Sequence, residues 1–141
     1  MDMKVDLDVA ISLRDDIAEA EVLALYRANA WSSAEKPALL MAALRNSHSL
    51  VTARVAGELV GLGNAISDGH LVVYFPHILV LPEFHSRGIG RKMMQAFLER
   101  YGSFHQLMLT ADGGAIEFYK RLGFVRAGHT EPMWIYAGTD H

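Results

Sequence analysis

The chain has 141 residues, of which 51% are hydrophobic and 21% are charged. This length suits one compact domain, and the composition is that of a globular chain rather than a disordered one, so we expect a single domain over residues 1–141. The net charge of -3 provides no general attraction to nucleic acid or to an anionic membrane. The absence of cysteine excludes disulfides, thiolate metal ligands and cysteine nucleophiles.

The N-terminus and the apolar runs bear on membranes and targeting. Residues 1–8, MDMKVDLD, are acidic and lack the apolar stretch of a signal peptide. No run approaches the ~18 consecutive apolar residues that a membrane-spanning helix needs. These features predict a cytoplasmic protein that binds neither membranes nor nucleic acid.

The first half of the chain carries one strand, two helices and a hairpin. Residues 4–11 alternate apolar and polar side chains, and residues 15–30 place apolar side chains at helical spacing. Residues 32–47 are rich in alanine and leucine and start with a serine-to-glutamate spacing typical of a helix N-terminus. Residues 50–66 indicate a hairpin that turns at 56–58, followed by a turn at 67–69.

The second half begins with the strongest strand pattern, residues 71–81. Pro76 interrupts it, and because proline cannot donate to a β-ladder it predicts a bulge or an edge there. A helix at 89–101, a strand at 105–111, a helix at 115–122 and a final strand at 132–136 follow from their periodicity. The expected order is β-α-α-β-β-β-α-β-α-β, a mixed α/β (α+β) domain.

A glycine-rich turn, EFHSRGIGRKMM at residues 83–94, joins the strand to the helix. The first N–H groups of a helix lack internal partners and carry partial positive charge. Gly88 and Gly90 have no Cβ that would keep an anion from those groups, and three cations, Arg87, Arg91 and Lys92, stand beside them. The turn therefore suits a diphosphate.

The alternative is that the glycines only relieve a tight turn and the cations are solvated, which is the ordinary meaning of a glycine pair alone. Two familiar phosphate motifs do not match. Arg91 follows Gly90 where a P-loop needs lysine, and Met93 stands where a dinucleotide motif needs a third glycine.

The stretch ILVLPEFHSRGIGRKM, residues 78–93, resembles the central motif of the GNAT superfamily, the acyl-coenzyme A dependent N-acetyltransferases. It matches at Pro82, Glu83, Phe84, Gly88 and Gly90, while His85 stands where glutamine or arginine is usual. A second segment, DGGAIEFYKRLGF at 112–124, resembles the motif that follows in the family. It matches at Ala115, Phe118, Tyr119, Leu122, Gly123 and Phe124.

Both motifs lie in the family's order, and the element order extends the resemblance to nearly the whole chain. The resemblance implies a GNAT-like fold with a central mixed, mostly antiparallel sheet flanked by helices. It also implies direct transfer of an acetyl group from acetyl-CoA to a primary amine in a ternary complex. The implied cofactor-binding positions are Leu79, Val80 and Leu81 by their backbone, then Arg87, Gly88, Ile89, Gly90, Arg91 and Lys92, and Asp112 in place of the usual asparagine.

The resemblance places Tyr119 beside the coenzyme sulfur, where it could protonate the leaving thiolate. The alternative is that its helix only packs. The general base is open: Leu107 occupies the position of a glutamate in many relatives, and His77 occupies another carboxylate position on the central strand. Histidine titrates near neutral pH and could take the amine's proton, but it could equally be structural, with a bound water as base.

The acceptor of the family lies over the first two helices and the hairpin. Candidates there are Asn29, Trp31, Asn64, Asp68 and Tyr74. A loose likeness to small bacterial and plastid-type members favours a small-molecule primary amine.

Other functions and an assembly state stand beside this interpretation. The Leu107 and Asp112 departures leave open an inactive acyl-CoA sensor or interaction module. Nucleic-acid binding is disfavoured because the cations are confined to one turn, and no histidine spacing suggests a metal. A homodimer, common in the family, could form through exposed apolar strands or the segment around Trp134.

Overall fold

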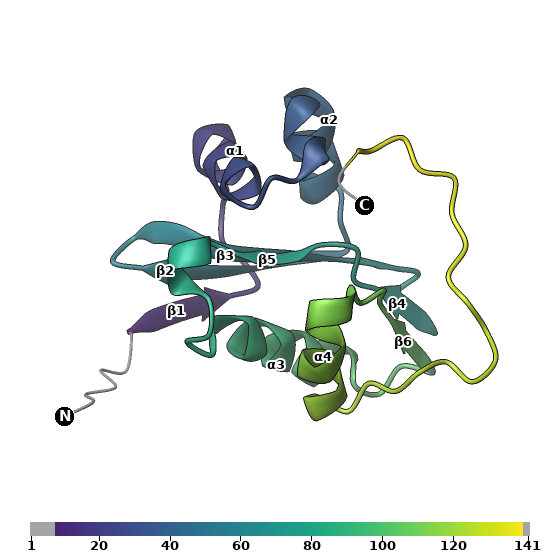
Figure 1. Ribbon diagram of the computed structural model, residues 1–141. Helices are drawn as coiled ribbons and strands as arrows, with labels where there is room; N and C mark the ends of the chain where they lie inside the picture. The colour runs from purple at the N-terminus through teal and green to yellow at the C-terminus, as the bar shows by residue number, and fades with distance from the viewer. Residues whose placement is uncertain (1–7, 140–141) are drawn as a thin grey trace.

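The computed structural model describes residues 8–139, and the expected strand at 4–11 lies partly outside this range. A six-stranded mixed sheet forms the middle layer, with helices on both faces (Figure 1). The hydrogen-bonded order is β1-β2-β3-β4-β6, and β5 pairs with β3 off this path. Among the described residues, only β4 and β6 pair in parallel. The strands are β1 (Val9–Ser12), β2 (Ser49–Val55), β3 (Glu58–Ser67), β4 (Val72–Tyr74), β5 (Ile78–Val80) and β6 (Gln106–Met108).

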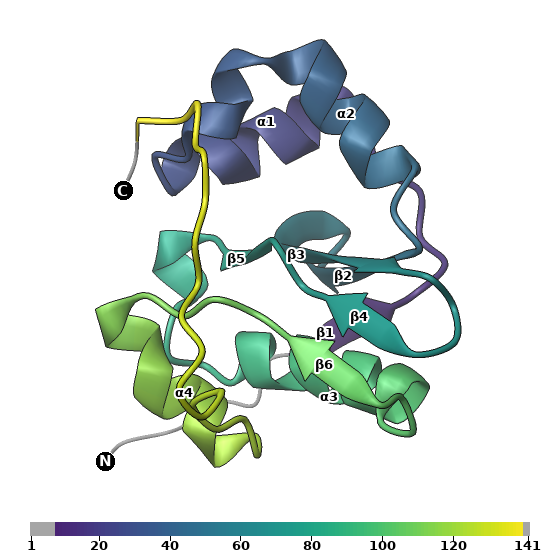
Figure 2. The ribbon, with the colours of Figure 1, turned by 90° about the vertical axis from the view of Figure 1, so that its right-hand side faces the viewer.

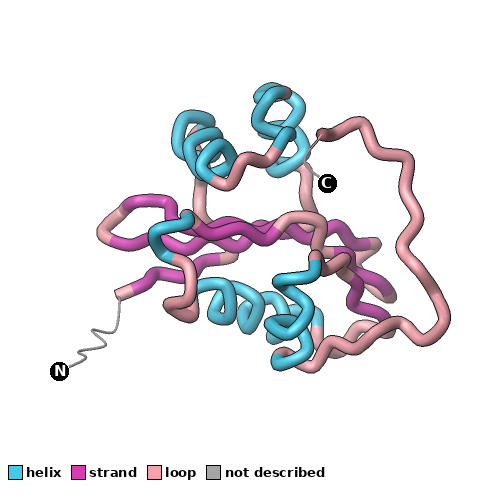
Figure 3. Tube along the Cα trace, in the orientation of Figure 1, coloured by secondary structure: helices cyan, strands magenta, loops and turns pink. Residues whose placement is uncertain are grey.

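Helices cover both faces of the sheet, which gives three layers (Figures 2 and 3). The amphipathic α3 packs Met93, Phe97 and Tyr101 fully into the core, as its helical spacing predicts. The mixed, mostly antiparallel sheet flanked by helices is confirmed. The helices are α1 (Glu19–Ala28) and α2 (Pro37–Arg45) on one face, and α3 (Ile89–Tyr101) and α4 (Ile116–Arg121) on the other.

The single helix expected at 32–47 is split. Residues Ser32–Glu35 form a 3-10 turn, and α2 starts afresh at Pro37. The cause is local, because the residue before a proline is kept out of the helical region, and Lys36 accordingly has φ -125° and ψ 64°. Ser32 is also not the N-cap residue that the serine-to-glutamate spacing predicts, since the N-cap residues of the two starts are Trp31 and Lys36.

The final strand expected at 132–136 is wrong. After α4 the described chain forms no further helix or strand, and residues 125–139 run from the α4 side to the α1 and α2 side at one end of the sheet (Figure 1, yellow). The side chains of residues 133–136 favour β structure, but a strand also needs a neighbouring strand to pair with. Within residues 8–139 no strand pairs with them.

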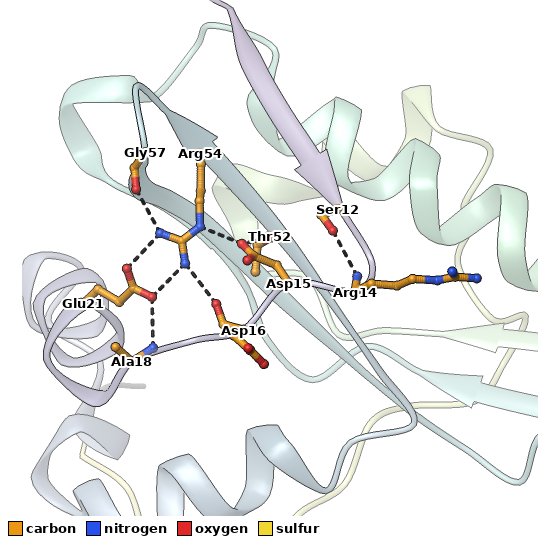
Figure 4. A network of polar contacts seen from close by, with 9 residues as sticks. All are labelled: Ser12, Arg14, Asp15, Asp16, Ala18, Glu21, Thr52, Arg54 and Gly57. Atoms are coloured by element: carbon orange, nitrogen blue, oxygen red, sulfur yellow. Dashed lines mark hydrogen bonds and ion pairs between the residues drawn. The ribbon is translucent and has the colours of Figure 1, made fainter.

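Arg54 on β2 fixes the connection between β1 and α1 (Figure 4). Its Nε donates to Asp15 Oδ2 at 2.6 Å, and its two terminal nitrogens donate to the two oxygens of Glu21 at 2.8 Å each. It also donates to the carbonyls of Asp16 and Gly57, both at 3.0 Å. A bidentate, partly buried ion pair of this kind holds the start of α1 against β2.

The pKa values of both carboxyl groups respond to this contact. Hydrogen bonding to Arg54 lowers the pKa of Glu21. Burial pushes the pKa of Asp15 up, but hydrogen bonds from Arg54 and Thr52 outweigh it, so that pKa is lowered as well. Both carboxylates therefore stabilise the folded state at pH values above their ordinary pKa. This contribution is lost as the pH falls through their lowered pKa values.

Replacing Arg54 by methionine keeps an apolar stem and removes the charge. We expect the free energy of unfolding to fall by roughly 2 kcal/mol at neutral pH, because two carboxylates lose their partner. Urea unfolding at about pH 7 and about pH 3 checks this, since protonation should shrink the difference between variant and wild type. An equal difference at both pH values would show that the ion pairs do not contribute.

Candidate active site

A one-residue bulge interrupts the central strand. β4 pairs with β3 up to Ile66↔Tyr74, and β5 resumes pairing at Gly63↔Ile78. Residues 64–65 of β3 therefore face residues 75–77, which is two residues against three. Pro76 lies inside this bulge, as its missing N–H predicts.

The Asn64 side chain holds the bulge in place. Asn64 N–H donates to the His77 carbonyl at 3.0 Å, and His77 N–H donates back to Asn64 Oδ1 at 3.1 Å. The side-chain amide also donates to Ser47 Oγ at 3.1 Å, and Asn64 is only 4% exposed. A side chain thus replaces a ladder bond that the regular strand would have made.

The two strands on either side of the bulge have different neighbours. β4 pairs with β6, and Phe75 N–H still donates to the Met108 carbonyl at 3.0 Å. Past the bulge β5 pairs only with β3, so within residues 8–139 no strand lies along its other edge. The central strand therefore parts from the β6 segment where β5 begins.

The open edge of β5 presents backbone groups. Leu81 N–H donates to the Val60 carbonyl of β3 at 2.8 Å, and backbone direction alternates along a strand. Of the predicted backbone positions, Leu79 and Leu81 thus face β3 and Val80 faces the open edge. Ile78, which was not predicted, faces the open edge as well. The Val80 carbonyl already accepts from Asn29 Nδ2 at 3.0 Å. An extended ligand could pair with the groups that remain.

The glycine-rich turn follows directly. Ser86 and Gly88 both have left-handed backbones, with φ of 62° and 80°, separated by one residue. The first hydrogen bond into α3 runs from Lys92 N–H to the Gly88 carbonyl at 3.1 Å. The N–H groups of residues 89–91 precede it and have no carbonyl within the helix. The glycines of this turn are visible in the sequence. The left-handed backbone of Ser86 is not, because serine does not favour that conformation.

The turn has the chemistry of a diphosphate site. Left-handed residues alternating with others make backbone N–H groups converge, and a helix N-terminus adds positive potential. Arg87, Arg91 and Lys92 are exposed beside it, with the Arg87 guanidinium 5.6 Å from the Phe84 ring centroid. The atypical His85 donates from Nε2 to the Val80 carbonyl at 2.8 Å, tying the turn back to β5. The residues present suit a diphosphate.

Helix α4 packs on the start of α3. A Cβ built on Gly90 would lie 3.4 Å from Phe118 Cζ, which is ordinary van der Waals contact, so α4 closely approaches the start of α3. Tyr119 follows, with its ring centroid 5.0 Å from that of Phe118. Burial raises the pKa of Tyr119 to about 12, so its phenol stays protonated at neutral pH and can donate a hydrogen bond. Asp112 is exposed and accepts a backbone hydrogen bond from Ala115 N–H at 2.7 Å.

His77 lies on the opposite face of the sheet from Tyr119, under α1. Its Nδ1 is 2.7 Å from Tyr26 Oη, and its ring centroid is 5.2 Å from that of Trp31 at a near-perpendicular angle of 83°. Tyr26 is fully buried, and burial raises its pKa, so it stays a neutral phenol. The helical spacing of residues 15–30 does not predict this contact, because Tyr26 and His77 are 51 residues apart in the chain.

The other predicted acceptor residues do not all lie near His77. Asn29 and Trp31 lie beside β5 and His77, whereas Tyr74 is on β4 and 39% exposed. Asp68 instead caps its turn: its Oδ1 accepts from the N–H groups of residues 70–72, and these hydrogen bonds lower its pKa. Leu107 packs against the core and offers no base.

Two kinds of feature are absent from residues 8–139. No group of three or more histidine, aspartate or glutamate side chains could hold a metal ion there. None of the helices in this range is both long and apolar enough to cross a bilayer.

The profile of the acetyltransferase (GNAT) domain matches residues 14–133, which includes the bulge, the glycine-rich turn and α4. The chain belongs to the GNAT acetyltransferase family. Among solved structures, a GNAT family acetyltransferase of Streptococcus pneumoniae TIGR4 superposes with a TM-score of 0.79 at 26% identity, covering 92% of this chain and 98% of that one. Aminoglycoside N-acetyltransferase AAC(6')-Iy, solved in complex with CoA, shares the fold with a TM-score of 0.68 at 18% identity, covering 95% and 97% of the two chains.

Sequence relatives match over shorter stretches. An uncharacterized N-acetyltransferase (ycf52) of Gracilaria tenuistipitata var. liui is 30% identical over 86 residues, 55% of this chain and 47% of that protein. A GCN5-related N-acetyltransferase 2 of Arabidopsis thaliana, described as chloroplastic, is 32% identical over 71 residues, 48% of this chain and 27% of that protein. The matches thus span about half or less of these relatives' length, and a cytoplasmic location of this GNAT protein stays a prediction.

Replacing Asn64 by alanine should lower the free energy of unfolding by roughly 2 kcal/mol, because the half-buried His77 N–H and Ser47 hydroxyl lose a partner. Asn46 is the matched control, since its side chain bonds the Ala42 carbonyl at 2.7 Å on an exposed surface. Its replacement by alanine should change stability by only about 0.5 kcal/mol. Urea unfolding of both variants measures this, and equal losses would mean that Asn64 has no special role.

Proposed function

We propose that this GNAT protein is an acetyl-CoA dependent N-acetyltransferase that acetylates a primary amine of a small molecule by direct transfer. The observation that carries the proposal is the open edge of β5, which begins at the bulge and leads straight into the left-handed turn before α3. A pantetheine arm is extended and carries amides, and it ends at a diphosphate. One continuous stretch of backbone thus offers matching groups to both.

Backbone donors would hold most of the cofactor. Ile78 and Val80 face the side where the arm would lie, and the N–H groups of residues 89–91 face the diphosphate end. Arg87, Arg91 and Lys92 would add charge without needing a fixed geometry. Asp112 accepts hydrogen bonds but cannot donate when ionised, so it suits the amide N–H groups of the arm.

Bound acetyl-CoA would supply the acetyl group as an activated thioester. The amine must reach it unprotonated, and its nitrogen then forms the new C–N bond as the C–S bond breaks. Tyr119 keeps its proton at neutral pH, because burial raises its pKa to about 12, and it would donate that proton or a hydrogen bond to the departing sulfur.

His77 is the proposed base, with Tyr26 orienting it. To accept a proton at Nε2, the neutral imidazole must carry its hydrogen on Nδ1, and Tyr26 Oη at 2.7 Å can accept a hydrogen bond from that Nδ1–H. The same contact remains after Nε2 is protonated. Trp31 would limit how far the ring can turn, since it meets the imidazole nearly at right angles.

A hollow beside Trp31 supports a small acceptor. It has a volume of about 470 Å³ and lies between the end of α1, the 3-10 turn after it and the C-terminal segment. Glu35 and Arg27 line it and could meet polar groups of an amine. A site of this size suits a small molecule.

An inactive acyl-CoA sensor is the second candidate. It is favoured by Leu107, an apolar side chain packed against the core where many relatives have a glutamate. The sensor and the enzyme share the cofactor site and differ only in turnover.

Saturating acetyl-CoA should raise the melting temperature by about 5–10 °C, because a ligand at 100 times its Kd stabilises the folded state by about 2.7 kcal/mol. Thermal unfolding with and without the cofactor measures this. Gly88→Ala should reduce the shift, since a left-handed φ of 80° disfavours any side chain there. No shift in the wild-type protein would contradict both candidate functions.

An amine panel with mass detection of acetylated products then separates the two candidates. The enzyme acetylates at least one amine and consumes the thioester in step with product. A melting shift without any turnover would favour the sensor.

His77→Ala should lower kcat by about 10²–10⁴-fold and remove the ionisation that limits the rate on the acid side of the pH profile. His48→Ala is the matched control, because His48 Nδ1 also lies 2.6 Å from a tyrosine hydroxyl, that of Tyr101, away from β5. The control should keep the wild-type profile. An unchanged profile for His77→Ala would leave a water molecule as the base.

A further inference from the structure

The backbone carbonyl of Val80 has two side-chain donors. Asn29 Nδ2 lies 3.0 Å from its oxygen, and His85 Nε2 lies 2.8 Å from it. A carbonyl oxygen only accepts hydrogen bonds, so the His85 imidazole carries a hydrogen on Nε2. Because a backbone carbonyl has two lone pairs, these two donors use its whole capacity to accept. The Val80 carbonyl is thus fully occupied by its own chain.

This carbonyl lies on the edge where an extended ligand would pair. Val80 is the last residue of β5, and its carbonyl shares a trans peptide group with the N–H of Leu81. That N–H donates to the Val60 carbonyl of β3, so the Val80 carbonyl points to the opposite, open side. An amide of a ligand at this edge would bring its N–H donor to about 2.9 Å from the same oxygen. His85 Nε2 already lies at such a distance.

The two donors differ in how easily they can leave. Asn29 is half-buried, and its side-chain amide also donates to the Leu25 carbonyl at 3.0 Å, which ties it to α1. His85 is exposed, and its ring can turn about its side-chain bonds and donate to water instead. The net contribution of such a hydrogen bond is small, since water replaces it. His85 is therefore the donor that a ligand can displace.

The segment around His85 keeps its shape without the imidazole. Phe84 N–H donates to the Leu81 carbonyl at 2.9 Å. The N–H of His85 itself donates to the Pro82 carbonyl at 3.1 Å. These are backbone hydrogen bonds of a short 3-10 turn, and they do not involve the ring. Removing the His85 side chain should leave the glycine-rich turn and its converging N–H groups in place.

We propose that His85 is a latch on the cofactor edge, closed on the Val80 carbonyl in the free protein and opened when coenzyme A binds along β5. The inference rests on the proposed function, because it takes coenzyme A as the ligand of this edge. On binding, Val80 exchanges the Nε2–H of His85 for an amide N–H of the pantetheine arm, and the imidazole turns into water. Only hydrogen bonds are exchanged, and no covalent bond changes.

The latch sets the affinity for the cofactor. When only the open fraction of a protein binds, the apparent Kd equals the intrinsic Kd divided by that fraction. A hydrogen bond of ordinary strength at an exposed side chain keeps the open fraction low enough that its loss tightens binding roughly 3–10-fold. A residue that contacted the diphosphate would have the opposite effect, because its loss would weaken binding. The sign of the change thus separates the two roles of His85.

Calorimetric titration with coenzyme A tests the latch without requiring turnover. His85→Phe keeps a ring of similar size and removes the N–H, and His85→Ala removes the whole side chain. We expect both variants to bind coenzyme A about 3–10-fold more tightly than the wild type, because the Val80 carbonyl regains a free lone pair. His105→Ala is the matched control. His105 is exposed just before β6, at the end of the β4–β6 pair that lies away from the bulge, and its loss should leave the Kd unchanged.

The possible results separate the latch from the proposed function. Tighter binding of both His85 variants, with an unchanged control, supports the latch. Unchanged or weaker binding of either His85 variant would overturn the latch, and the proposed function would stand as long as the wild type binds coenzyme A. No binding by the wild type or by either variant would contradict the proposed function as well.

Discussion

The paired hydrogen bonds between Asn64 and His77 are the constraint on which the site depends. They let a side chain stand in for a ladder bond and so stabilise one extra residue in the central strand. Before that residue the strand pairs with β6, and after it the strand pairs only with β3. The open edge of β5 is a consequence of the bulge, and so is the position of His77 under α1.

The bulge also lets one short strand serve both faces of the sheet. On the α3 and α4 face, β5 leads into the left-handed turn and its converging N–H groups, which suit an anion. On the α1 and α2 face, His77 meets a neutral phenol and an indole in a mostly apolar setting. The glycine-rich turn and His77 therefore lie at opposite ends and on opposite faces of the same short strand. Arg54 contributes at a distance, because it fixes the start of the helix that carries Tyr26.

Local features of the sequence predicted the local parts of the structure. Glycine spacing, helical periodicity and the missing N–H of Pro76 located the turn, α3 and the bulge, because each acts within a few residues. Contacts between distant positions were not predictable: His77 lies 13 residues from Asn64 and 51 from Tyr26. The residue type of Ser86 does not predict its φ of 62°. Residues 132–136 were expected to form a strand because strand propensity reflects the side chains and not whether a neighbouring strand is available. The catalytic roles of Tyr119 and His77 stay predictions.

Amide hydrogen exchange with and without coenzyme A tests the central claim most directly, namely that the bulge opens β5 as the binding edge. The account predicts slower exchange on binding at two separated sites, the N–H groups of Ile78 and Val80 and those of residues 89–91, with little change along β1 and β2. Protection confined to the turn, with Ile78 and Val80 unaffected, would contradict it, because the diphosphate would then bind without any pairing along β5.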